Sequence, residues 1–269
     1  MTALEPRPPL VDIHCHVLAG FDDGAADADE SLAMARLAAA DGIAAVVATP
    51  HQLGSFRKNC GEAIRRAVAA LGERLAGHGV ALRVFAGAEV RIEPDLAPKI
   101  RDGEVLTLAD QGRHVLLELP HEVYLPVEPV LEQLHAAGLA GILAHPERNL
   151  GILHRPKVLE RLADAGCLMQ LTAGSLAGTF GPQVQGLAER LLLEGYVHFV
   201  ATDAHSAQTR RPMLRRAWDR VAQLGGLPTA CELCCGNPAS VVAGRQVLPG
   251  RRRPVRSFRS GWSFWRKAS

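Results

Sequence analysis

Short runs of consecutive apolar residues alternate along the chain with longer stretches in which apolar residues recur every three or four positions. Runs that are apolar at successive positions indicate strands buried on both faces, as in a parallel sheet. The runs begin about 30 residues apart, which is the length of one strand, one helix and two short loops. They lie at 8–14, 42–51, 81–90, 113–120, 139–147, 167–175 and 196–205.

The stretches between these runs have the period of an amphipathic helix. They end in glycine, the usual residue beyond a helix C-terminus, and the first opens with aspartates that suit a helix N-terminus. The predicted helices lie at 27–42, 59–79, 127–138, 155–166 and 181–195. Seven strand–helix units in a single domain predict an α/β barrel of the TIM type, with a doubly wound sheet as the alternative.

Charge separates the body of the chain from its C-terminal end. Residues 245–269 hold eight of the 30 Lys and Arg and no acidic residue, so residues 1–244 carry a net charge of −6. An acidic body argues against nucleic acid as a partner. We therefore expect one domain over 1–244, followed by a flexible basic tail over 245–269. Arginines alternate with Phe and Trp in the tail, a pattern that suits contact with acidic lipid or an acidic protein.

The sequence also bears on the location of the protein and on the oxidation state of its cysteines. No apolar run reaches the roughly 18 residues of a membrane span, and the N-terminus lacks the features of a signal peptide. We expect a cytoplasmic protein with reduced cysteines. Cys231, Cys234 and Cys235 cluster, but no second pair or nearby histidines complete a zinc site, so we interpret them as an apolar helix face.

Ionisable residues gather where the predicted strands end, and in α/β barrels this rim carries the active site. The first strand ends in Asp12-Ile13-His14-Cys15-His16, which places His14 and His16 on one side of an extended segment. The other strand ends carry His51, Glu89, Glu118, His145, Asp203 and His205. The histidines without this placement, which we expect to be structural, are His78, His114, His121, His135, His154 and His198.

So many ionisable groups facing one mouth would be costly to bury without cations. Imidazole nitrogens and carboxylate oxygens without a thiolate suit Zn, Mn or Fe better than Mg or Ca. About nine candidate ligands exceed the needs of one ion, so we expect two or three divalent ions, with a carboxylate such as Glu89 as a bridge. Such clusters generate hydroxide near neutral pH and neutralise the oxygens of a transferring phosphoryl group.

Taken together in order, the motifs resemble the PHP (polymerase and histidinol phosphatase) superfamily. Within it, the chain is similar to the bacterial metal-dependent tyrosine-protein phosphatases encoded with capsular and extracellular polysaccharide genes, over residues 9–245. The motifs are DIHCH at 12–16, DDG at 22–24, ATPH at 48–51, GAEV at 87–90, LLELP at 116–120, AHPERN at 144–149, GSLAGTFG at 174–181 and ATDAHSAQTR at 201–210.

The resemblance implies the PHP fold, a distorted seven-stranded barrel with three metal ions, manganese or iron, at its C-terminal rim. The first ion would take His14, His16, Glu89 and Asp203, the second His51, Glu89 and His145, and the third Asp23, Glu118 and His205, with Asp22 as a further neighbour. Arg148 and Arg210 match family arginines that face the phosphate, and their planar forks suit bidentate contact with it.

The implied activity is hydrolysis of phosphotyrosine by attack of a metal-bound hydroxide on phosphorus. The implied substrate is the tail of a bacterial tyrosine kinase that controls capsular or exopolysaccharide synthesis. Phosphatases acting on histidinol phosphate and phosphoesterases acting on nucleic acid share the metal core, but the acidic body and GSLAGTFG favour the tyrosine-phosphatase branch. A non-catalytic, metal-stabilised protein that binds a kinase is another alternative, although it leaves the two arginines unexplained.

Two further features bear on this resemblance. Family members that assemble into rings carry Arg-Glu-Glu-Ser in the first helix, whereas this chain has Ala28-Asp29-Glu30-Ser31, so the homo-oligomeric state stays open. Residues Cys60 to Arg66 have the C-x5-R spacing of cysteine-dependent phosphatases. Because Cys60 follows a polar stretch and opens a predicted helix, we interpret the spacing as a coincidence.

Overall fold

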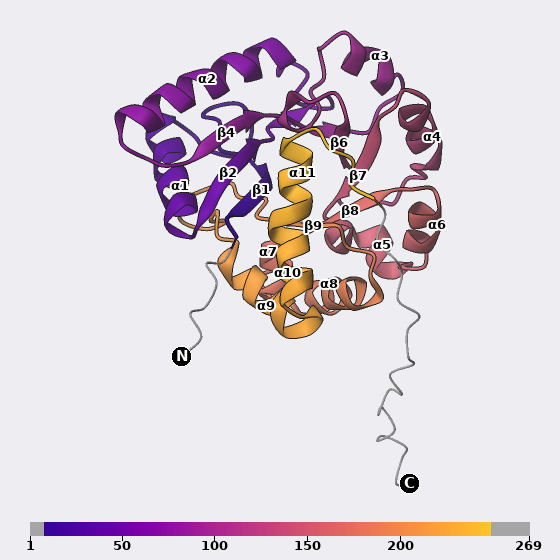
Figure 1. Ribbon diagram of the computed structural model, residues 1–269. Helices are drawn as coiled ribbons and strands as arrows, with labels where there is room; N and C mark the ends of the chain where they lie inside the picture. The colour runs from indigo at the N-terminus through magenta and orange to yellow at the C-terminus, as the bar shows by residue number, and fades with distance from the viewer. Residues whose placement is uncertain (1–7, 249–269) are drawn as a thin grey trace, which may run out of the picture.

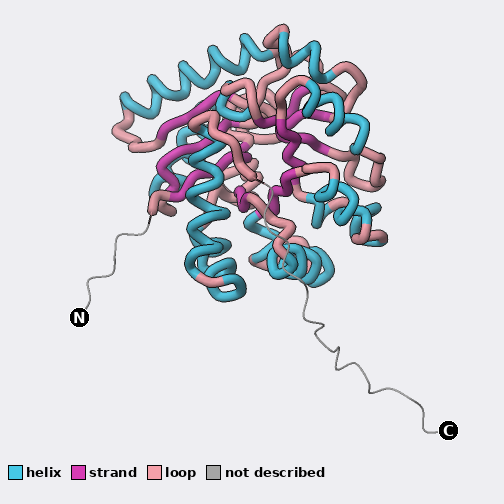
Figure 2. Tube along the Cα trace, turned by 45° about the vertical axis from the view of Figure 1, so that its right-hand side comes forward, coloured by secondary structure: helices cyan, strands magenta, loops and turns pink. Residues whose placement is uncertain are grey.

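The strands of the protein lie inside a layer of helices, in a computed structural model that describes residues 8–248 (Figures 1 and 2). Each of the predicted apolar runs contains a strand. The strands are β1 Leu10–Cys15, β2 Ile43–Ala48, β3 His51–Gln52, β4 Arg83–Ala86, β5 Glu89–Arg91, β6 His114–Glu118, β7 Ala140–Ala144, β8 Leu168–Thr172 and β9 Phe199–Ala201.

All pairs of neighbouring strands are parallel, as predicted, and they form two sheets with the orders β1-β2-β4 and β3-β5-β6-β7-β8-β9. The prediction of unbroken strands was wrong for the second and third runs, which are divided into β2 and β3 and into β4 and β5. The first break contains Pro50, which has no N–H to donate to a sheet. At the second, a Cβ on Gly87 would lie 2.6 Å from Cγ1 of Val47, so only glycine fits this close approach.

The segment that follows β9 lies beside the end of β1. The amide of His16 donates to the carbonyl of Ala204 at 2.8 Å, and the amide of Asp203 donates to the carbonyl of His14 at 2.8 Å. The strand order follows the chain without the reversal of a doubly wound sheet, so that alternative is not what residues 8–248 form.

Helices cover the outer faces of the sheets. They are α1 Ala28–Ala40, α2 Gly61–Gly77, α3 Leu96–Arg101, α4 Glu128–Ala136, α5 Leu150–His154, α6 Val158–Asp164, α7 Ala173–Leu176, α8 Pro182–Glu194, α9 Arg215–Gly225, α10 Leu227–Cys231 and α11 Asn237–Val242, with short helical turns at Leu108–Asp110, Pro146–Arg148 and Glu232–Gly236. The predicted helices correspond to α1, α2, α4, α6 and α8. The side chain of Asp27 accepts hydrogen bonds from the amides of Asp29 and Glu30, which explains why α1 begins there.

Two apolar clusters hold the fold together. The larger one joins the helices to the outer faces of the strands, and the smaller one lies between the strands and contains Ile13, Leu116 and Phe199. Helix α11, which crosses in front of the strands in Figure 1, adds Val241 to the smaller cluster. The expected tail lies outside the described residues from 249 onward. Within residues 8–248, no helix is long and apolar enough to cross a membrane.

Candidate metal centre

The predicted site residues meet at the carboxyl ends of the strands, around a cleft of about 180 Å³. All of them line this cleft except Asp22 and the fully buried His14 and His16. The cleft is also lined by His121, which we had expected to be structural, and by Asn149. The predicted position of these residues, at the carboxyl ends of the strands, is therefore the position that the structure shows.

The most deeply buried group brings four ligand atoms together. Nε2 of His14 lies 3.2 Å from Nε2 of His16, 3.3 Å from Oε2 of Glu89 and 3.4 Å from Oδ1 of Asp203. Nε2 of His16 lies 3.4 Å from the same Glu89 oxygen and 3.6 Å from the same Asp203 oxygen. Ligands about 2.0–2.2 Å from one ion are separated by about 2.8–3.6 Å in tetrahedral or octahedral geometry. His14, His16 and Glu89 therefore form one candidate ligand set, and Asp203 joins His14 and His145 in another.

The far nitrogens of these histidines are held by acceptors outside the group. Nδ1 of His14 lies 2.9 Å from Oε1 of Gln170, and Nδ1 of His16 lies 2.7 Å from Oδ2 of Asp22. Nδ1 of His205 lies 3.0 Å from the backbone carbonyl of Asp203. An acceptor at Nδ1 fixes the tautomer that leaves the Nε2 lone pair free, which is the usual arrangement of a histidine that binds metal. The surroundings of the cluster thus suit metal binding as well as its geometry does.

Glu89 lies at the centre of a second group. Its Oε1 is 2.9 Å from Nε2 of His145, and its Oε2 is 3.2 Å from Nδ1 of His51. Oε2 of Glu118 is 3.6 Å from the same His51 nitrogen. One carboxylate oxygen thus faces the deep histidines and His51, while the other faces His145, so Glu89 lies among four of the predicted ligands. The structure groups Glu118 with His51 and Glu89, whereas the resemblance implied a place beside Asp23 and His205.

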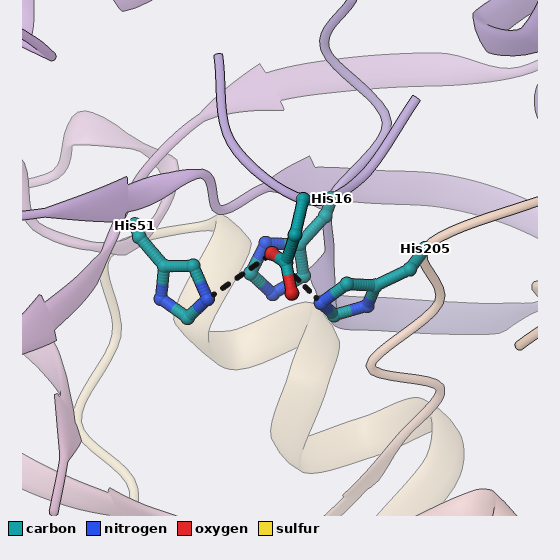
Figure 3. A group of neighbouring side chains, drawn as sticks. His16, His51 and His205 are labelled. Carbon is teal, nitrogen blue, oxygen red and sulfur yellow. Dashed lines mark ion pairs between the residues drawn. The ribbon is translucent and has the colours of Figure 1, made fainter. Parts of the chain in front are cut away.

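A third group surrounds the exposed carboxylate of Asp23. The Oδ1 atom of Asp23 is 3.4 Å from Nε2 of His51 and 3.3 Å from Nε2 of His205. Figure 3 shows the side chains of His16, His51 and His205 gathered around one point. His16 and Asp23 follow β1, His51 begins β3 and His205 follows β9. The four side chains form a possible ligand set at the mouth of the cleft.

Charges in the cluster shift the pKa values of its members in opposite directions. Burial acts to lower the pKa of His14, but the carboxylates of Glu89 and Asp203 outweigh it, so this pKa is raised. Burial acts to raise the pKa values of Glu89 and Asp203, yet the neighbouring histidines hold both well below the ordinary range. The two carboxylates are therefore ionised at neutral pH and present a concentrated negative charge to a cation.

The two predicted phosphate-binding arginines approach the cluster from one side. Both guanidinium groups contact Oδ2 of Asp203, while its Oδ1 faces His14 and His16. Asp203 thus separates the histidine side of the cleft from the arginine side. Arg148 and Arg210 are 17% and 29% exposed, so their remaining N–H groups can reach a ligand in the cleft.

Two site residues have left-handed backbone conformations that non-glycine residues rarely adopt. The φ angles are 33° at His145 and 51° at Asp203. Such conformations cost about 1–3 kcal/mol each and often occur at functional sites. Here they lie where the chain leaves the sheet after β7 and β9, at two of the predicted ligands.

Comparison with known proteins agrees with this geometry. Residues 10–243 match the family described as "Capsular polysaccharide synthesis, CpsB/CapC". The chain belongs to the CpsB/CapC family. It is 38% identical to the tyrosine-protein phosphatase YwqE of Bacillus subtilis over 203 residues, which are 75% of this chain and 79% of YwqE. It is 27% identical to the tyrosine-protein phosphatase CpsB of Streptococcus pneumoniae over 239 residues, 87% of this chain and 98% of CpsB.

The fold also matches a solved structure of this CpsB/CapC group. The match has a TM-score of 0.87 at 34% identity and covers 91% of this chain and 99% of the other. That structure comes from a study of YwqE and CpsB, which it describes as unique metal-dependent tyrosine phosphatases. The family resemblance drawn from the motifs is therefore confirmed.

Sequence reasoning missed the buried polar residues that support the ligands of this CpsB/CapC-family chain. Asp12 accepts hydrogen bonds from the amides of Thr202 and His14 at 3.0 and 3.2 Å, and burial raises its pKa to about 6. Gln170 is fully buried and holds His14. A signal was present, because Asp12 and Gln170 are polar residues flanked on both sides by apolar ones within strand runs.

The C-x5-R spacing forms no phosphate-binding loop. Cys60 directly precedes α2, while Arg66 lies inside this helix and pairs with Glu62. Cys234 and Cys235 are buried in the core after α10, as the apolar helix face predicted.

Proposed function

We propose that this protein is a metal-dependent tyrosine-protein phosphatase that binds two or three divalent ions. Manganese is the first choice, with iron and zinc as the alternatives. The observation that carries the proposal is the position of Glu89, whose carboxylate lies within 3.4 Å of four histidines in a cluster beside two arginines. A site for a neutral substrate would need neither this negative charge nor the arginines.

In the proposed mechanism, each part of the cleft has its own task. Ions held by the cluster would supply a nucleophile at neutral pH and neutralise charge on the phosphoryl oxygens. His14, His16, Glu89 and Asp203 would hold the first ion, His51, Glu89, Glu118 and His145 the second, and Asp23, His51 and His205 the third. Gln170 and Asp22 would orient His14 and His16 through their Nδ1 atoms.

Arg148 and Arg210 would bind and orient the phosphoryl group. Their contacts with Asp203 place both guanidinium groups beside the predicted ligands, at the wall of the same cleft. A guanidinium fork can donate two parallel hydrogen bonds to phosphate oxygens, and such contacts fix orientation as well as charge. No step in this mechanism requires Cys60.

The wider setting is also part of the proposal. The substrate would be a phosphotyrosine-bearing protein, and the names of the relatives together with the capsular family favour a tyrosine kinase of polysaccharide synthesis. The strands would form a distorted seven-stranded barrel within a phosphatase domain of residues 1–244, and the basic tail would contact acidic lipid or protein. Six free cysteines suit a reducing, cytoplasmic location.

The test is a comparison of substrates on one preparation. Purified protein loaded with Mn²⁺ should hydrolyse a phosphotyrosyl peptide with a higher kcat/KM than histidinol phosphate, and chelation should abolish both activities. Faster hydrolysis of histidinol phosphate would assign the protein to the other branch of phosphatases. Binding of the phosphopeptide without turnover would indicate the non-catalytic alternative.

A further inference from the structure

The guanidinium of Arg148 rests on an aromatic ring. Its Cζ lies 4.3 Å from the centroid of the Phe180 ring, and Nη1 contacts Asp203 from another direction. An aromatic face attracts the cation without accepting its in-plane N–H groups. Phe180 therefore restrains Arg148 and leaves the donor edges of the guanidinium free for a phosphate.

The ring of Phe180 is itself held in place by the backbone beneath it. A Cβ on Gly174 would lie 3.0 Å from Cε2 of Phe180, so the ring packs directly against this glycine. The amide of Thr179 donates to the carbonyl of Gly174 at 2.9 Å, which folds the segment back onto α7. Gly178 and Gly181 have φ angles of 82° and 89°, a backbone that other residues rarely adopt.

A second anchor joins Arg148 to the same segment. The neighbouring residue, Glu147, is fully buried and accepts hydrogen bonds from the amide of Thr172 at 2.9 Å and from Oγ of Ser175 at 2.7 Å. The backbone of Arg148 is thus tied to the start of α7, and its side chain is tied to the turn that follows α7. The backbone and the guanidinium of Arg148 are therefore both held by residues 172–180.

We propose that residues 173–181 form a platform whose function is to position the guanidinium of Arg148, with Phe180 as the positioning residue. The inference rests on the proposed role of Arg148 in binding the phosphoryl group. It assigns a task to the GSLAGTFG motif, none of whose side chains lines the cleft. Phe180 acts through Arg148 and has no separate contact with the reacting atoms.

The experiment is a double-mutant cycle on the full chain loaded with Mn²⁺. Phe180→Leu keeps the apolar bulk but removes the ring, and should lower kcat/KM on a phosphotyrosyl peptide by about three- to thirtyfold with unchanged metal content. Phe180→Trp, which keeps an aromatic face, should recover most of the loss. In an Arg148→Ala background, Phe180→Leu should cost nothing further, because the residue that it positions is gone.

The chain offers a matched control in Phe85, whose ring lies 4.9 Å from Cζ of Arg83. Phe85→Leu removes a comparable cation–π contact outside the cleft and should leave kcat/KM unchanged. If Phe180→Leu unfolds the protein, Phe180→Met, an unbranched side chain without a ring, replaces it in the cycle.

The possible results separate the platform from the proposed function. Equal losses from Phe180→Leu in the presence and absence of Arg148 would overturn the platform but leave the role of Arg148 intact. A parental kcat/KM for Arg148→Ala would overturn the proposed role of Arg148, and the platform with it. A failure of Phe180→Trp to recover activity in a folded, metal-loaded protein would show that the aromatic face is not what holds the arginine.

Discussion

Two pairs of buried histidines lie at opposite ends of the strands and differ in almost every other respect. His14 lies near the carboxyl end of β1 and His16 directly follows this strand. His114 begins β6, and His198 directly precedes β9. All four are nearly inaccessible to solvent, with exposures between 0% and 4%. Burial lowers the pKa values of His114 and His198 to about 4, while carboxylates raise those of His14 and His16.

The two pairs of histidines differ in whether carboxylates surround them. Neither ring nitrogen of His114 has a hydrogen-bond partner, so this side chain packs as a neutral apolar group. Nδ1 of His198 accepts a hydrogen bond of 3.1 Å from the backbone amide of Met169. At the other end, His14 and His16 share the carboxylates of Glu89 and Asp203. The position along the strand decides which role a histidine has.

Removing the central anion should have the largest effect. Glu89→Gln keeps the shape of the side chain but removes the charge that joins the two groups of histidines. Loss of an outer partner of a metal ligand costs about 10- to 100-fold, so loss of this carboxylate should reduce phosphatase activity by more than a hundredfold and lower the bound metal. Turnover and metal content of the purified variant measure this.

Glu104 provides the control, since its side chain is exposed and lies outside the cleft lining. Glu104→Gln should keep parental turnover and metal content. Near-parental activity of Glu89→Gln at saturating metal would contradict the assignment of the cluster.

Substitution of the arginines that contact Asp203 should lower activity without the loss of metal that we expect for the histidines and carboxylates. Charge-assisted contacts contribute about 1.5–3 kcal/mol, so Arg148→Ala or Arg210→Ala should lower kcat/KM by roughly ten- to a hundredfold without loss of metal. Arg148→Lys should recover only part of this loss, because a single ammonium cannot replace the fork. Steady-state kinetics with metal analysis checks both points.

Arg220, which pairs with Glu189 on the helical surface, is the matched control for these variants. Arg220→Ala should have parental kinetics. A loss of activity in Arg148→Ala or Arg210→Ala that merely follows lost metal would mean that the arginines support the ions rather than the phosphate.

The position of many candidate site residues could be predicted because they lie at the ends of apolar runs. His51, Glu89 and His145 each lie at the end of such a run, and parallel strands bring these ends together. The resemblance added Asp23, which precedes α1 in a turn that strand periodicity does not mark. The structure places Glu118 near His51 and Glu89 rather than near Asp23 and His205, because the side of the cluster that a carboxylate faces depends on rotamers and neighbours that a sequence does not specify.

Other features depend on the path of the chain in space. The divisions between β2 and β3 and between β4 and β5 follow from a proline and a close approach at Gly87, which only the packed sheets reveal. The contact between Gln170 and His14 joins residues 156 positions apart. The packing of Phe180 against Arg148 depends on the turn after α7, whose conformation no periodic pattern encodes.

The histidines at the opposite end of the strands should influence stability rather than activity. The pKa of His114 is about 4 in the folded protein and near 6.5 when unfolded, so the unfolded state takes up the proton first as the pH falls. Folding therefore weakens between pH 6.5 and about 4. His114→Leu should keep parental activity and remove about 2 kcal/mol of the destabilisation at pH 4.5, which reduces the acid-induced fall in Tm by roughly 5–10 °C.

Thermal unfolding of both proteins at pH 7 and pH 4.5 measures this effect. An identical fall in Tm for parent and variant would show that His114 does not contribute to acid sensitivity. A loss of phosphatase activity at pH 7 in the folded variant would contradict the claim that histidines at the amino ends of the strands affect stability and not activity.

The smallest effect is expected at Cys60, which lies before α2 and outside the cleft lining. Cys60→Ser should retain parental kcat/KM and the same sensitivity to chelation, because no step uses a thiolate. An inactive Cys60→Ser protein with its fold and metal content unchanged would favour a cysteine nucleophile.

The most direct test of the central claim is a metal titration of phosphotyrosine hydrolysis. Protein stripped by a chelator and then titrated with Mn²⁺ should show no turnover of a phosphotyrosyl peptide at first, and activity should rise to saturation at two or three ions per chain. Glu89→Gln in the same titration should remain inactive and bind fewer ions. Full activity in the metal-free parent, or an equal response of Glu89→Gln, would contradict the account.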